Sequence, residues 1–114
     1  MESPQESQYT VITTRQAEAA FYQFLDYLYE NYPLDRAEEL ANQLRDKTKE
    51  LHYLPERGSA EPDIRQGTRR YRSILFERTP RAQIKIIYYI DKASHAVYVT
   101  DFFPTEKDTA NMKG

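Results

Sequence analysis

The chain has 114 residues, of which 39% are hydrophobic and 30% are charged, and its formal net charge is −2. Cysteine is absent and the two histidines lie far apart in sequence, so disulfides and thiolate chemistry are excluded and we expect neither a metal site nor a cofactor. We expect a cytoplasmic protein, because no secretory signal and no apolar run of membrane-spanning length is present.

The first predicted element is a short strand at Gln8–Ile12, "QYTVI", whose alternation would bury Tyr9 and Val11. A helix is predicted to follow, because Thr13 and Gln16 have the spacing of a capping box. Its apolar positions recur at helical period and end just before a proline: Ala17, Ala20, Phe21, Phe24, Leu25, Leu28 and Tyr32. This pattern predicts an amphipathic helix with one buried face.

A second helix is predicted to start at Asp35, with Glu38 three residues later. Its buried stripe would be Ala37, Leu40, Ala41, Leu44, Thr48 and Leu51. Because only a few residues separate the two predicted helices, we expect an antiparallel helical hairpin.

The C-terminal half is predicted to be a sheet. Leu54–Gly67 contains two prolines and two glycines and is therefore interpreted as a connection. Strand-like runs follow at Thr68–Glu77, Ala82–Ile90 and Ala96–Phe103, and the short turns between them favour antiparallel pairing.

We therefore expect one α+β domain spanning residues 1–114, with flexible ends at 1–7 and 109–114. Its order would be an N-terminal strand, an antiparallel helical hairpin on one face of the sheet, and a three-stranded antiparallel meander. The predicted core combines the helical stripes with one face of the middle strand: Phe21, Phe24, Leu28, Leu40, Leu44, Ile84, Ile86 and Tyr88.

Positive charge is concentrated in the first two strands of the meander. Residues 65–85 hold seven arginines and lysines against one glutamate, a local net charge of +6, so the remaining chain carries −8. Such a region attracts an acidic partner. The candidate binding residues are Arg69, Arg70, Arg72 and Lys85, together with Lys107 in the polar tail.

The alternation of a strand divides these cations between two faces. Arg70 and Arg72 share one face and Arg69 lies on the other, so the three cannot form one site. If Ile84 faces the helices, then Lys85 faces away from them, and we expect it beside Arg72 on the uncovered face. The alternative for each arginine taken alone is a solvated strand edge, where charge opposes aggregation.

The order of several short motifs resembles the RelE/ParE superfamily of toxins from toxin–antitoxin systems. The resemblance spans Gln8–Asp108 and rests on "LHYLPERGSAEPDIRQGTRRY", "IKIIYYID" and "VYVTDF". It implies a small toxin that inhibits growth and is neutralised by an antitoxin encoded beside it, in a complex that binds operator DNA through the antitoxin. It also implies that the uncovered sheet face and its adjacent groove receive the C-terminal segment of the antitoxin.

Two activities occur in this superfamily, and they need different residues. The ribonuclease branch uses cations on the sheet to stabilise charge that develops on a phosphate. On that pattern Arg72 and Lys85 match, whereas Ile74 and Glu106 stand where cations are required and no tyrosine follows. The catalytic set is therefore incomplete.

The ParE branch is the closer match. Its longer helical hairpin, Pro- and Gly-containing connection and arginine-rich start of the second strand are all present, although "FFPTEKD" replaces its frequent His-Gly and Arg ending. The leading hypothesis is a toxin that inhibits DNA gyrase by protein–protein binding and is not an enzyme. The alternatives are a ribosome-dependent mRNA endoribonuclease with Arg72 and Lys85 as candidate catalytic residues, and an inert binding module.

The remaining polar and aromatic residues are assigned structural roles first. His52 at a helix end and His95 in a turn are interpreted as capping or solvent-facing groups. Tyr22, Tyr27 and Tyr29 lie beside the stripe of the first helix, where core packing is the first explanation and a partner surface the second.

Overall fold

The computed structural model of the chain describes residues 8–62, 64, 69–79 and 82–105, with the backbone alone at 78, 79 and 82. Two helices, α1 (Arg15–Asn31) and α2 (Leu34–Lys49), pack on a five-stranded sheet. The strands are β1 (Thr10–Thr13), β2 (Ser59–Ala60), β3 (Tyr71–Thr79), β4 (Ala82–Asp91) and β5 (Ala96–Pro104), and short 3-10 turns lie at η2 (Glu50–His52) and η3 (Pro55–Arg57). Their order in the sheet is β1-β5-β4-β3-β2.

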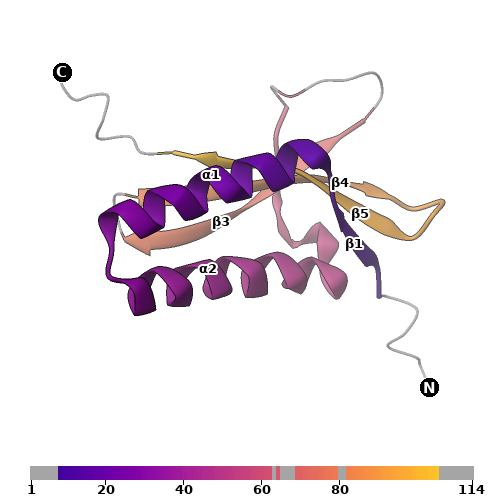
Figure 1. Cartoon of the computed structure of the whole chain (residues 1–114). Coiled ribbons are helices and arrows are strands. Elements are labelled where there is room, and N and C mark those ends of the chain that lie inside the picture. Colours follow the sequence, from indigo (N-terminus) through magenta and orange to yellow (C-terminus); the bar gives the residue numbers. More distant parts are fainter. Residues whose placement is uncertain (1–7, 63, 65–68, 80–81, 106–114) are drawn as a thin grey trace.

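The helical hairpin forms as predicted, with small shifts at its ends. Thr14, one residue later than expected, caps α1 by accepting a hydrogen bond from the Ala17 amide at 3.2 Å. Thr13 instead ends β1. α2 begins at Leu34 directly after Pro33, and the two helices run antiparallel (Figure 1).

The core lies between this hairpin and one face of the sheet. All eight predicted core residues belong to it, and Leu28, Leu44, Ile86 and Tyr88 have no solvent exposure. Ile86 therefore faces the helices and Lys85 faces away, which confirms the predicted register of the second strand of the meander.

The sheet differs from the prediction in two respects. β1 pairs with β5 in parallel, so the sheet is mixed, whereas the predicted antiparallel meander β3-β4-β5 is confirmed. The connection also contains a strand that the sequence did not indicate, since the two residues of β2 pair with Ser73 and Arg72 of β3. The expected flexible ends lie outside the described residues.

Neither helix in the described part of the chain is long and apolar enough to cross a membrane.

Candidate binding surface

One face of the sheet is not covered by α1 and α2, and we call it the open face. Directly paired residues of neighbouring strands share a face, so the open face can be followed across the strands. It presents three rows of side chains: Tyr71, Tyr89, Tyr98 and Ile12; then Ser73, Ile87 and Asp101; then Leu75, Lys85 and Phe103.

These rows differ in their access to solvent. The middle row is largely closed, with Ser73 and Ile87 each only 6% exposed. Ile64 of the connection lines a hollow together with Tyr71, Ile87 and Tyr89, so the connection lies against this part of the sheet. In the third row, by contrast, Leu75 is 44% and Phe103 51% exposed.

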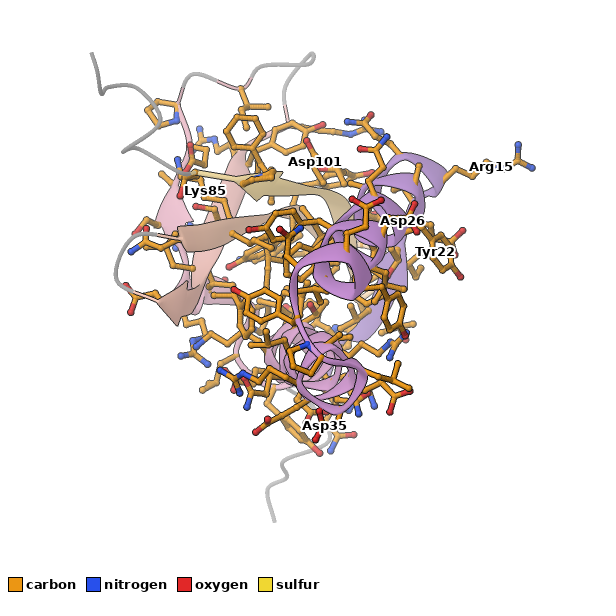
Figure 2. The ribbon with its side chains drawn as sticks, turned by 60° about the vertical axis from the view of Figure 1, so that its left-hand side comes forward. Arg15, Tyr22, Asp26, Asp35, Lys85 and Asp101 are labelled. Atoms are coloured by element: carbon orange, nitrogen blue, oxygen red, sulfur yellow. The ribbon has the colours of Figure 1, made fainter. Side chains whose placement is uncertain are left out.

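We call Leu75, Lys85 and Phe103 the Lys85 patch. Lys85 lies on β4 between its two paired neighbours, Leu75 on β3 and Phe103 on β5. Figure 2 shows Lys85 at the sheet, remote from the outward-pointing Tyr22 of α1. An ammonium group with an exposed apolar side chain on either side suits a partner that brings both apolar contacts and a carboxylate.

Arg72 does not join this patch, which corrects the expected pair of Arg72 and Lys85. In the register of β3 and β4, Arg72 stands opposite Tyr88 and Lys85 stands opposite Leu75. Since Tyr88 faces the helices, Arg72 lies on the helix side of the sheet. The two cations are therefore on opposite faces.

Arg72 instead holds the connection against the sheet. Its Nη2 donates to the carbonyl oxygens of Glu56 at 2.9 Å and Gly58 at 2.6 Å. The buried Tyr88 hydroxyl donates to the Pro55 carbonyl at 2.5 Å and accepts from the Gly58 amide at 3.2 Å. Burial raises the pKa of the Tyr88 hydroxyl, which keeps it protonated as a donor.

The other predicted cations lie near one end of the sheet. Arg69 places its guanidinium 4.6 Å from the centre of the Tyr89 ring, a cation–π contact. Arg70 is exposed and lines one hollow together with Arg69 and Arg72, which corrects the expectation that the three could not meet at one site. Lys92, Glu56 and Asp91 line the same hollow. Carboxylates thus accompany the arginines here. Lys107 and Glu106 lie outside the described residues.

The two histidines and Tyr9 tie β1 to its neighbours. The His52 Nδ1–H donates to the Tyr9 carbonyl, and the Tyr9 ring stacks on His95 with 4.1 Å between ring centres. The Tyr9 amide in turn donates to the His52 carbonyl at 2.8 Å. These contacts give the histidines a structural role at the start of the fold.

Core packing accounts for only part of the surface of the three tyrosines of α1. Tyr22, Tyr27 and Tyr29 are 61%, 39% and 49% exposed. Tyr27 stacks on Phe24 and lines a hollow with Ile84 of β4, so it packs at the margin of the core. For the exposed surface of Tyr22 and Tyr29, a partner surface is the second explanation.

A charged cluster adjoins the Lys85 patch and was not predicted. Glu61, in the connection, accepts a hydrogen bond from the Ser73 hydroxyl at 2.7 Å and pairs with Lys85 at 2.9 Å. The Ser73 hydrogen bond and then the contact with Lys85 lower the pKa of the Glu61 carboxyl below its ordinary 4.5. Nothing in the local pattern of the connection indicates this contact, because it depends on the pairing of β2 with β3.

The lowered pKa predicts a pH-dependent contribution of Glu61 to stability. A carboxyl whose folded pKa lies below its unfolded value stabilises the fold above about pH 4.5, and this contribution is lost as the pH falls through the folded pKa. Urea unfolding should therefore show wild type more stable than Glu61→Gln at neutral pH, with the difference disappearing in acid. A difference that is constant with pH would contradict the contact.

Comparison with known proteins supplies the family. The model of a family described as "ParE toxin of type II toxin-antitoxin system, parDE" matches residues 11–109. A solved structure titled "Chromosomal ParDE TA system from P. aeruginosa" is similar in fold, with a TM-score of 0.66 at 15% sequence identity, over 85% of this chain and 96% of that chain. No curated protein matches the sequence.

Proposed function

Because this chain belongs to the ParE toxin family of type II toxin–antitoxin systems, we propose that it inhibits DNA gyrase by binding it and that its antitoxin neutralises it on the open face. The toxin would act in the cytoplasm, and the toxin–antitoxin complex would bind operator DNA through the antitoxin. Membership in this family implies a cognate antitoxin as partner.

The Lys85 patch is the observation that supports the open face as the surface that binds the antitoxin. Apolar residues flanking a cation, exposed on a sheet face that no helix covers, are typical of a surface that a partner buries. The exposed row is about three strands wide, which suits an extended or helical segment lying across β3, β4 and β5.

The separation of Arg72 from Lys85 supports binding rather than catalysis. A ribonuclease must aim several cations at one phosphate. Here Arg72 is engaged by backbone carbonyls on the helix side, Lys85 lies on the other face, and Ile74, at a position where that chemistry needs a lysine, is buried in the core. This geometry favours the gyrase hypothesis over the ribonuclease alternative.

Two assays with purified toxin separate the activities. We expect the toxin to inhibit supercoiling by gyrase, to lose that inhibition when the antitoxin is added, and to leave mRNA on translating ribosomes intact. Lys85→Ala should retain the inhibition of gyrase in the absence of antitoxin, because the patch is assigned to neutralisation.

Cleavage of ribosome-bound mRNA with normal supercoiling would reject the proposal. If the rate of that cleavage also fell by about a hundredfold or more in Lys85→Ala, then Lys85 would be a catalytic residue, and the ribonuclease hypothesis would replace the gyrase hypothesis.

A further inference from the structure

The Glu61 carboxylate occupies the polar centre of the open face. It lies 2.7 Å from the Ser73 hydroxyl and 2.9 Å from the Lys85 ammonium, and its side chain is 16% exposed against 34% for Lys85. Two donors from different strands, β3 and β4, therefore converge on one carboxylate that a third segment supplies.

The position of Glu61 follows from the pairing of β2 with β3. Ser59 and Ala60 stand opposite Ser73 and Arg72, and the Glu61 amide donates to the Tyr71 carbonyl at 2.8 Å. Glu61 thus extends the antiparallel register by one residue and places its side chain on the same face as Tyr71, which is the open face. Only the two residues of β2 precede it in this pairing.

The site that Glu61 occupies adjoins exposed apolar surface. Leu75 and Phe103, the paired neighbours of Lys85, leave 44% and 51% of their surface in solvent. A segment covering them would bring its own atoms within reach of Lys85. Burying Lys85 under an apolar segment without a carboxylate partner would be unfavourable, so the segment must either leave Glu61 in place or replace it.

We propose that Ser73 and Lys85 form a carboxylate-binding subsite for an acidic residue within an apolar segment of the antitoxin, and that Glu61 occupies this subsite in the free toxin. This inference rests on the proposed neutralisation at the open face. Binding exchanges one carboxylate for another, so Lys85 has a carboxylate partner both in the free toxin and in the complex. The antitoxin binds only those toxin molecules in which Glu61 has moved aside. Its apparent dissociation constant is therefore the intrinsic constant divided by the fraction of toxin in that state.

The test compares two neutral substitutions in the same connection. Glu61→Gln removes the internal competitor, while Glu56→Gln removes the same charge from an exposed ion pair with Lys92 at 3.4 Å, away from the subsite. The probe is the purified product of the reading frame adjacent to the toxin gene, with association and dissociation rates measured by surface plasmon resonance against the full-length toxin.

We expect Glu61→Gln to bind this antitoxin about five- to tenfold more tightly than wild type, mainly through faster association. Glu56→Gln should bind within about twofold of wild type, because it reproduces only the change in overall charge. In a Lys85→Met background the gain from Glu61→Gln should disappear, since the two residues then no longer compete for one contact.

Equal or weaker binding by Glu61→Gln would overturn the inference, as would an equal gain from Glu56→Gln. Failure of the proposed neutralisation at the open face would give a different set of affinities. If Lys85→Met and Leu75→Asp both bind the antitoxin as wild type does, then the antitoxin lies elsewhere. If those variants lose affinity while Glu61→Gln does not gain it, the open face stands and only the role of Glu61 fails.

Discussion

Gly58→Ala should lower the free energy of unfolding by about 2–4 kcal/mol. A Cβ at position 58 would lie 2.5 Å from the Ser73 carbonyl oxygen and also against the Tyr88 hydroxyl. One neighbour is backbone of a paired strand and the other is a fully buried side chain, so neither can yield without disturbing the sheet or the core.

Gly58→Ala should lose this much stability because several contacts meet at residue 58. The Gly58 amide donates to Tyr88, and its carbonyl accepts from Arg72, so a displaced backbone would lose both hydrogen bonds. The same displacement would disturb β2 and, with it, the position of Glu61. The control is Ser59→Ala at the exposed neighbouring residue, which should change stability by no more than about 0.5 kcal/mol. Equal urea midpoints for Gly58→Ala and wild type would show that the connection does not approach the sheet at this point.

Leu75→Asp and Phe103→Asp should each weaken antitoxin binding about 30-fold or more while leaving the fold intact. Both side chains are about half exposed in the free toxin, so their replacement costs little in folding, whereas a new carboxylate at the centre of a buried interface is costly. Isothermal titration with the antitoxin measures the affinity, and thermal unfolding of each free variant checks the fold.

The matched control is Leu34→Asp. Leu34 is 65% exposed at the start of α2, so the same substitution is made on a leucine at least as exposed but outside the open face. We expect its affinity to equal that of wild type. If Leu34→Asp weakened binding and the two patch variants did not, the antitoxin would belong on the helical side of the molecule.

Local periodicity predicted the parts of the fold that each segment determines alone. The helical stripes and the alternation of "IKIIYYID" gave the core and placed Lys85 away from the helices, because burial of one face decides both. The same rule applied to β3 would have placed Arg72 correctly. Ile74 and Phe76 are buried, and Arg72 shares their face, so it could not also lie on the uncovered side.

The features of the fold that the sequence did not predict depend on contacts between distant segments. The parallel pairing of β1 with β5 joins the two ends of the described chain, and no local pattern specifies it. Glu61 stands in a connection rich in proline, glycine and charge, where a two-residue strand has no recognisable period. Its contact with Lys85 therefore becomes visible only when the register of β2 on β3 is known.

Site-specific photo-cross-linking tests most directly whether the antitoxin covers the open face. A benzophenone amino acid replaces Leu75, Phe103 or, as the control, Leu34, and each toxin is irradiated in complex with the antitoxin. We expect a covalent toxin–antitoxin product from positions 75 and 103 and none from position 34. A product from position 34 alone would show that the antitoxin does not cover the open face.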